Sequence, residues 1–310
     1  MSPGRVDLRT LERDGDVLRC ECGARYPIVD GVPVVLPEAD DFLSREALEA
    51  EPLGEAPLYF DGPDHTPACR LAEHLSTYLD AHWGDHATPP LTGAGLAPGM
   101  QAVRERIAAR ASAPVARAVE LGCSVGRIVA ELRAGAEEVV GLDLRLGALR
   151  RARRLLAGEA VEYGRRQIGR HYLPVVASPG PCADGWSLVC GDALDPPLLP
   201  GEYDRVVALG VFDSVRDPGQ LLAVLDGLCA PGGEIILASP YAWQSGVVDE
   251  AARFGGADPT GALVARLRGG ADLRAAYVIE DEAELPWVLR RDDRAAVHYQ
   301  VHYLRAHKRG

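Results

Sequence analysis

The sequence predicts an α/β protein with a doubly wound parallel sheet, an antiparallel edge strand, a small N-terminal β module and a helical cover. Three observations support this fold class. Short apolar runs alternate with helical stretches from Val115 onward, acidic residues occur at the ends of three such runs, and apolar and polar residues alternate with period two over 297–303. Strands that alternate with helices are typical of parallel sheets with helices on both faces.

The composition favours a globular enzyme. With 310 residues, 47% of them hydrophobic, the chain can form one α/β domain with an added module. The net charge of -12 disfavours a nucleic acid partner, and the arginines between 145 and 170 fit a solvated helix face. Neither a signal peptide nor a long apolar run is visible, so we expect a cytoplasmic protein with no membrane partner. The seven scattered cysteines fit reduced thiols.

We expect three regions along the chain. Residues 1–40 contain short strands and the Asp30-Gly31 turn signal, which predicts a small β module. Residues 41–113 are mostly helical and should cover the domain that follows. Residues 114–310 should form that α/β domain.

The strands of the α/β domain are predicted from apolar runs. The five candidates for the parallel sheet are 115–121, 138–142, 186–190, 204–209 and 234–238. The period-two run at 297–303 predicts the antiparallel edge strand. The stretch 159–185 is too long for an ordinary connection and is interpreted as a substrate lid.

The first predicted strand ends in a glycine-containing turn, which runs from Glu120 through Gly122 and Cys123 to Gly126. In a doubly wound sheet, ligands bind outside the carboxyl ends of the strands, and glycines let the backbone approach them closely. Nicotinamide-binding folds use a similar turn, so this turn alone leaves the cofactor open.

Acidic residues follow the next two strands. Asp143 closes the second strand and can accept hydrogen bonds from both ribose hydroxyls of a nucleoside. Asp192 follows the third strand and can accept from an adenine amine. The fourth strand leads through Leu209 and Gly210 into a loop, and the turn at 231–233 precedes the fifth. These elements in this order predict a nucleoside-binding site.

From about residue 115 to the end, these motifs resemble the class I S-adenosylmethionine-dependent methyltransferases, whose fold is Rossmann-like. The resemblance implies S-adenosylmethionine as cofactor, with the glycine turn around its methionine moiety, Asp143 at the ribose, and Asp192 with Ala193 at the adenine. Ser124 stands where many members have the middle glycine. The cofactor residues that the resemblance implies are Glu120, Gly122, Cys123, Gly126, Asp143, Leu144, Asp192, Ala193, Leu209 and Gly210.

A narrower resemblance concerns 238–243 and 284–291, followed by His298. These segments look like the C-terminal domain of ovothiol synthases, which methylates the imidazole of a mercaptohistidine. The resemblance implies that Tyr241, Arg290 and His298 approach the substrate. On this basis we hypothesise that the guanidinium of Arg290 binds the carboxylate of the acceptor.

The remaining substrate residues come from the neighbouring loops. Residues 210–213 would border the transferred methyl group, so Phe212 is a candidate substrate contact, as is Trp243 beside Tyr241. If the acceptor must lose a proton, Asp213 or His298 is the candidate base.

The N-terminal segments 18–23 and 26–33 resemble the end of a small zinc-ribbon module related to an activator of tRNA methyltransferases. A structural zinc normally needs four ligands, whereas Cys20 and Cys22 form a single pair. We therefore expect no metal. Four histidines are further possible ligands, but we interpret them as helix-surface residues: His65, His74, His82 and His86.

The predicted function is methyl transfer to a small molecule, on a nitrogen of an imidazole or an amino-acid-like acceptor. Transfer to oxygen or sulfur of a secondary metabolite stays open, as does a catalytically silent partner protein with this fold. A nicotinamide enzyme is disfavoured by the turn at 231–233 and by the edge strand. The oligomeric state stays open.

Overall fold

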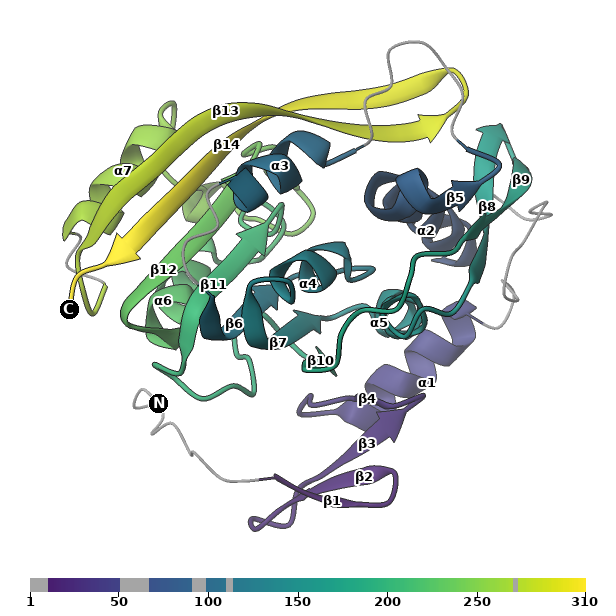
Figure 1. Ribbon diagram of the computed structural model, residues 1–310, viewed down its shortest axis with the longest axis horizontal. Coiled ribbons are helices and arrows are strands. Elements are labelled where there is room, and N and C mark those ends of the chain that lie inside the picture. Colours follow the sequence, from purple (N-terminus) through teal and green to yellow (C-terminus); the bar gives the residue numbers. More distant parts are fainter. Residues whose placement is uncertain (1–10, 51–66, 91–98, 110–113, 270–272) are drawn as a thin grey trace.

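The computed structural model describes residues 11–50, 67–90, 99–109, 114–269 and 273–310 (Figure 1). Its centre is a seven-stranded sheet with strand order β10-β7-β6-β11-β12-β14-β13. Five strands are parallel, and each predicted window falls within one of them. These strands are β6 (Val115–Leu121), β7 (Ala136–Asp143), β10 (Trp186–Cys190), β11 (Tyr203–Leu209) and β12 (Cys229–Ser239).

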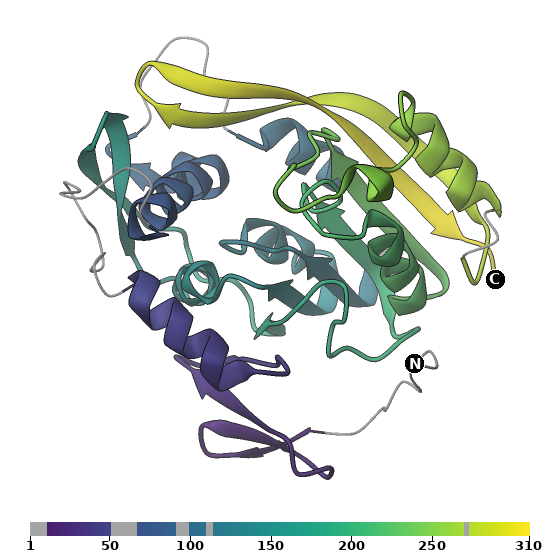
Figure 2. The same cartoon turned by 180° about the vertical axis from the view of Figure 1, so that it is seen from behind.

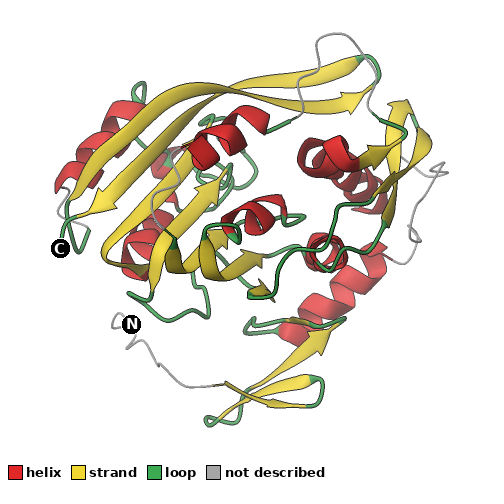
Figure 3. Ribbon diagram, in the orientation of Figure 1, coloured by secondary structure: helices red, strands yellow, loops and turns green. Residues whose placement is uncertain are grey.

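Helices pack on both faces of this sheet, as the doubly wound prediction requires (Figure 3). The alternation of side chains along each strand divides the core: Ala118 and Val139 pack on one side, and Val119 and Val206 on the other. The first side is covered by α3 (Gln101–Ala109), α4 (Arg127–Leu132) and α5 (Leu146–Leu156), and the second by α6 (Pro218–Leu228) and α7 (Pro259–Gly269).

The period-two run lies in β14 (Ala295–Lys308), which pairs antiparallel with β12 as expected. It is not the outermost strand. That position belongs to β13 (Tyr277–Asp292), which pairs with β14 along its length. The two strands form a long hairpin that continues past the end of β12 (Figures 1 and 2). The last register pair with β12 joins Ser239 and His302, so the hairpin residues from 285 to 301 extend beyond the end of β12.

The predicted lid is an ordered hairpin. Residues 161–177 form the antiparallel strands β8 (Val161–Ile168) and β9 (His171–Ala177). The short strand β5 (Ala87–Thr88) pairs with β9 and completes a three-stranded sheet. This sheet packs on α2 (Pro67–Trp83), where Arg165 pairs with Asp80 in the interior at 2.8 Å. The hairpin is thus tied down by a buried ion pair and by strand pairing.

The N-terminal module is a four-stranded antiparallel sheet followed by α1 (Ala39–Ala50). Val34 forms a parallel bridge with Cys190, and the Val35 backbone N–H donates to the Cys190 carbonyl at 2.8 Å. Arg150 of α5 pairs with Asp30 of the module, so part of the arginine cluster holds this module. The strands are β1 (Leu11–Asp14), β2 (Val17–Cys20), β3 (Arg25–Val29) and β4 (Val32–Pro33).

Within the described ranges, every helix is too short or too polar to cross a membrane.

Candidate functional site

The glycine turn after β6 depends on left-handed backbone conformations. Gly122 has φ of +79° and Gly126 has φ of +78°. A Cβ at Gly122 would lie 2.1 Å from Cγ2 of Val211, so a larger residue has no room there. Ser124 also has a positive φ, of +48°, a conformation that side chains other than glycine adopt at some cost.

Glu120 lies under this turn with 2% of its surface exposed. Its carboxylate accepts a backbone hydrogen bond from Val129, yet Oε2 has no hydrogen-bond partner among the described residues. Burial, reinforced by the charges of Asp143 and Glu131, raises the pKa of Glu120 well above its usual range. The buried hydroxyl of Ser124 likewise has no partner in the described part of the chain. Unpaired buried polar groups beside a glycine turn are candidate contacts for a ligand.

Asp143 holds the turn against the second strand. Its Oδ2 accepts from the backbone N–H of Ser124 and its Oδ1 from that of Arg145, both at 2.8 Å. Each carboxylate oxygen has a second lone pair, so both remain able to accept from a pair of hydroxyls. Leu144, the next residue, is 49% exposed. Cys123 is buried in the core, where burial raises the pKa of its thiol well above the usual value.

Asp192 follows the neighbouring strand β10. Its Oδ1 accepts from the backbone N–H of Leu194 at 2.8 Å, and its Oδ2 lies 3.1 Å from the guanidinium of Arg216. The preceding N–H, that of Gly191, donates to the carbonyl of Asp143 at 3.0 Å. The two predicted acidic residues therefore lie at adjacent strand ends. Ala193 is half-buried beside them.

The ends of β11 and β12 form the other half of the site. The backbone N–H of Gly210 donates to the carbonyl of Ala238 at 2.8 Å, and Leu209 is buried in the sheet. Trp287 of the long hairpin reaches this edge, because a Cβ at Gly210 would lie 3.6 Å from its ring. The hairpin therefore covers the end of β11.

Asp213 is buried and organises the loop that follows β12. Its Oδ2 accepts from the backbone N–H of Ala242 at 2.8 Å, and its Oδ1 accepts from the hydroxyl of Ser239 at 3.3 Å. Burial raises its pKa, although these hydrogen bonds oppose the shift. The predicted base thus has both oxygens engaged, and it links the ends of two neighbouring strands.

Three predicted substrate residues come together at this edge. Tyr241 lies with its ring centroid 6.2 Å from that of Phe212 and 5.8 Å from that of Trp243. Phe212 also contacts Phe254 edge to face, at 5.5 Å between centroids. Tyr241 has a positive φ of +51°, which is unusual for a bulky side chain. The phenol of Tyr241 is 2.8 Å from Nδ1 of His302, a residue that the sequence reasoning missed.

Arg290 and His298 lie apart from this aromatic group. Arg290 is 5% exposed and is bonded to Asp80 at 3.3 Å, to the carbonyl of Arg166 at 2.8 Å, and to Asp293. Its guanidinium therefore fastens the hairpin to α2 and β8. His298 is exposed on β14, opposite Val288.

The histidines of α2 were wrongly placed on the helix surface. His82 is 4% exposed, and His74 and Tyr78 lie on the same face, with ring centroids 4.3 Å apart. Burial lowers the pKa of both His74 and His82 to about 3, assisted by Arg145 for His74 and by Arg127 for His82. The spacing of four residues, which places side chains on one helix face, was the available signal. His65 lies outside the described residues.

Tyr78 connects this helix with the site. Its pKa is raised by burial first, and the charges of Asp143 and Asp213 act on it as well. The phenol of Tyr78 therefore lies within electrostatic range of one carboxylate in each half of the site.

The thiols of Cys20 and Cys22 lie 3.0 Å apart in the N-terminal module. In the ranges that the structure describes, no three histidine, cysteine or acidic side chains are grouped so that they could hold a metal ion.

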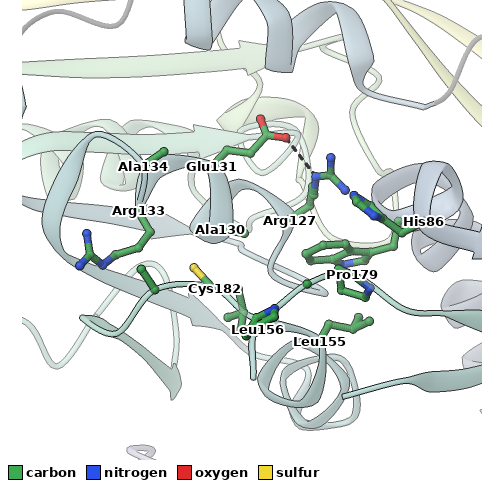
Figure 4. A pocket seen from close by; sticks show the side chains of 14 residues that line it. His86, Arg127, Ala130, Glu131, Arg133, Ala134, Leu155, Leu156, Pro179 and Cys182 are labelled. Atoms are coloured by element: carbon green, nitrogen blue, oxygen red, sulfur yellow. Dashed lines mark hydrogen bonds and ion pairs between the residues drawn. The ribbon is translucent and has the colours of Figure 1, made fainter. Parts of the chain in front are cut away.

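A cavity of about 330 Å³ lies elsewhere, between α4, α5 and the loop 179–183 (Figure 4). Arg127 lies over the ring of Trp83 at one end of it, 4.8 Å from the centroid, and pairs with Glu131. None of the predicted site residues lines this cavity.

Residues 119–237 match the methyltransferase domain family, and this stretch contains both the glycine turn and the ends of β7, β10 and β11. The match indicates a class I S-adenosylmethionine-dependent methyltransferase. It covers less than half of the chain. S-adenosylmethionine is accordingly the cofactor indicated for this chain, in agreement with the prediction from the motifs. No curated protein matches the sequence.

Several solved structures are similar. A Haloferax volcanii complex between the Trm112 methyltransferase activator and a candidate methyltransferase aligns at 15% identity over 77% of this chain and 97% of that chain, with a TM-score of 0.46. The Bacillus subtilis protein YcgJ aligns at 11% identity over 67% and 98% of the two chains, with a TM-score of 0.43.

A Haemonchus contortus phosphoethanolamine N-methyltransferase in complex with S-adenosyl-L-methionine aligns at 18% identity, covering 44% of this chain and 27% of that chain, with a TM-score of 0.34. Identities and TM-scores this low support no transfer of a substrate or a partner to the present chain.

Proposed function

We propose that this protein transfers a methyl group from S-adenosylmethionine to a nitrogen of a small imidazole- or amino-acid-like acceptor. The observation that carries the proposal is the division of the site. One half has unpaired buried polar atoms on a glycine turn. The other has an aromatic group around Tyr241, to which Asp213 is linked through Ser239 and Glu282 through His302.

The first half fits the cofactor. The unpartnered Oε2 of Glu120 suits the ammonium of a methionine moiety, and Gly122 leaves room where a Cβ would clash. Asp143 retains acceptor capacity for a ribose, and we assign Asp192 with Ala193 to the adenine. When bound, S-adenosylmethionine supplies an electrophilic methyl group. The chain's own residues then contribute mainly by holding the acceptor in line with that methyl group and by excluding water.

The charges of the second half favour nitrogen. The pKa of Tyr241 is raised by burial and by four carboxylates around it, those of Glu284, Asp213, Glu282 and Asp258. A negative environment disfavours the phenolate or thiolate that oxygen or sulfur transfer requires, whereas it stabilises the positive charge that a nitrogen acquires when it is methylated.

We infer a small acceptor from the side chains that lie over the site. The long hairpin brings Trp287 to Gly210, and Tyr78 of α2 lies within electrostatic range of Asp143 and Asp213. Arg290 is not assigned to the acceptor in this proposal, because its guanidinium already bonds to Asp80 and Asp293.

The test is a methyl-transfer assay with labelled S-adenosylmethionine and an acceptor panel that includes L-histidine, thiol derivatives of histidine, other amino acids, a phenol, an alkyl thiol and RNA. We expect turnover with an imidazole or amine, and a product methylated on nitrogen by mass spectrometry. Turnover with only the phenol, the thiol or RNA would contradict the acceptor assignment. Failure to bind S-adenosylmethionine would contradict the proposal as a whole.

A further inference from the structure

The half of the site at the ends of β11 and β12 is here called the acceptor half, and the half around the glycine turn the cofactor half. In the acceptor half, His302 lies between two polar partners. Its Nδ1 lies 2.8 Å from the phenol oxygen of Tyr241, and its Nε2 lies 3.1 Å from Oε1 of Glu282. The side chain of His302 is 3% exposed, whereas that of Glu282 is 45% exposed. The chain of hydrogen bonds therefore begins among the aromatic side chains and ends at the surface.

These contacts assign the hydrogens. An ionised carboxylate only accepts hydrogen bonds, so a neutral His302 that bonds to Glu282 carries its hydrogen on Nε2. Its Nδ1 must then accept, and the phenol of Tyr241 must donate to it. The lone pairs of the Tyr241 oxygen remain available to a group on its other side.

The backbone holds Tyr241 in the orientation that this contact needs. Its N–H donates to the hydroxyl of Ser239 at 3.0 Å, and that hydroxyl donates to Asp213. The positive φ of Tyr241 is strained for a residue with a side chain, and such strain persists where the surroundings enforce it. Ser239 and His302 are themselves register partners in β12 and β14, which fixes the distance across the chain of hydrogen bonds.

We propose that Tyr241, His302 and Glu282 form a proton path that carries the acceptor's proton from the methyl-transfer site to the solvent. This inference rests on the proposed function. Tyr241 is the catalytic residue of the path, since it meets the acceptor, and His302 and Glu282 act through it.

The step balances in atoms and charge. The acceptor's nitrogen lone pair forms the new bond to the methyl carbon while the bond from that carbon to sulfur breaks and leaves its electron pair on sulfur. The cation that forms then loses an N–H proton, from the methylated nitrogen of an amine or from the other ring nitrogen of an imidazole. This proton moves to the oxygen of Tyr241 as the phenol proton moves to Nδ1 of His302. The proton on Nε2 passes to Glu282 and then to water, and exchange with water restores the starting tautomer.

The first test examines the path in the protein without any acceptor. Nuclear magnetic resonance of protein labelled with ¹⁵N at histidine reports which ring nitrogen carries the hydrogen, and His302→Gln assigns the signal. We expect a single tautomer with hydrogen on Nε2, an Nδ1 signal that shifts in Tyr241→Phe, and an Nε2 signal that shifts in Glu282→Gln. The proposal is overturned if the His302 signals indicate mixed tautomers, or if the Nδ1 signal does not shift in Tyr241→Phe.

The second test measures turnover of L-histidine with labelled S-adenosylmethionine against pH. For His302→Gln and Glu282→Gln we expect kcat to fall about 10-fold to 100-fold near pH 6. The loss should be smaller near pH 9, where more of the acceptor is deprotonated in solution. The dissociation constant of the cofactor should stay within about two-fold of wild type. His307→Gln is the matched control, because this histidine lies further along the same strand, opposite Val278, and it should behave as wild type.

Two failures are distinguishable. If wild type turns over L-histidine and His302→Gln retains its kcat at every pH, the path is wrong and the proposed function stands. If wild type methylates nothing in the panel, the proposed function fails, and the proton path, which rests on it, fails as well.

Discussion

The carboxylate of Asp143, in the cofactor half of the site, bonds to groups that are close in the sequence, whereas the phenol of Tyr241, in the acceptor half, bonds to a distant residue. Asp143 bonds to backbone groups 19 and 2 positions away, at Ser124 and Arg145. Tyr241 and His302 are 61 positions apart, and they meet only because β14 pairs with β12. The two halves should therefore respond separately to substitution. Cofactor affinity should depend on the first half and be nearly insensitive to the second.

Gly122→Ala should have the largest effect on cofactor affinity. The new Cβ would lie 2.1 Å from Val211 in a residue with φ of +79°, so the turn must move. We expect S-adenosylmethionine to bind at least about 100-fold more weakly by titration calorimetry, equivalent to about 2.7 kcal/mol. Gly169→Ala is the control, because Gly169 has φ of +56° and open space around it. Equal affinity in Gly122→Ala and wild type would mean that this turn does not form the cofactor site.

Asp143→Ala should follow, with a loss of about 30-fold in cofactor affinity, or about 2 kcal/mol. The substitution removes the acceptor for the ribose and releases the backbone N–H of Ser124. Calorimetry on Asp195→Ala, an exposed aspartate after β10, provides the comparison. If both variants bind as wild type does, the ribose assignment is wrong.

Glu120→Gln should weaken cofactor binding by about 10-fold and should stabilise the protein without ligand. The pKa of Glu120 is raised in the folded state, so the native protein holds this proton more tightly than the unfolded chain does. Its contribution to stability is therefore present below the unfolded pKa and is lost as the pH rises through the folded pKa.

Denaturant unfolding without ligand should thus show Glu120→Gln more stable than wild type at pH 8, by about 1–3 kcal/mol, with a difference that shrinks toward pH 4. Glu137→Gln, at an exposed position on β7, should show no such trend. A gap that widens toward acid pH would reverse the assigned direction.

Asp213→Asn should have the smallest effect on the cofactor, within about two-fold in dissociation constant. An amide has one acceptor oxygen, so its NH2 group must replace the oxygen that accepts either from the N–H of Ala242 or from the hydroxyl of Ser239. The acceptor half should therefore lose about 1–2 kcal/mol of stability, measured by denaturant unfolding. A large loss of cofactor affinity here would show that the two halves are coupled.

The same division explains what the sequence could predict. The five parallel strands and the acidic residues at strand ends could be predicted from the sequence, because an apolar run, a turn and an acidic residue lie within a few positions of one another. Gly122 and Asp143 owe their geometry to that local order. Phe212, Tyr241 and Trp243 were found through short segments near strand ends, and the structure places them together.

The pairing of β13 with β14 could not be predicted from such local patterns. Both His298 and His302 lie on the period-two strand, and the pattern alone does not say which of them meets a partner. The choice depends on register, since Ser239 faces His302 while Val288 faces His298. Arg290 illustrates the same limit, because its partner Asp80 lies 210 positions away, on α2.

The placement of β14 has a consequence for how the chain is made. β13 leaves the ribosome before β14, yet it reaches the sheet through β14, which lies between it and β12. Until β14 has been synthesised, β12 is an open sheet edge and Tyr241 has no His302 to bond to. The nascent chain can complete its cofactor half while its acceptor half waits for the last strand. A premature stop within β14 would therefore remove two strands from the sheet, and we expect the shortened protein to bind S-adenosylmethionine but to transfer no methyl group.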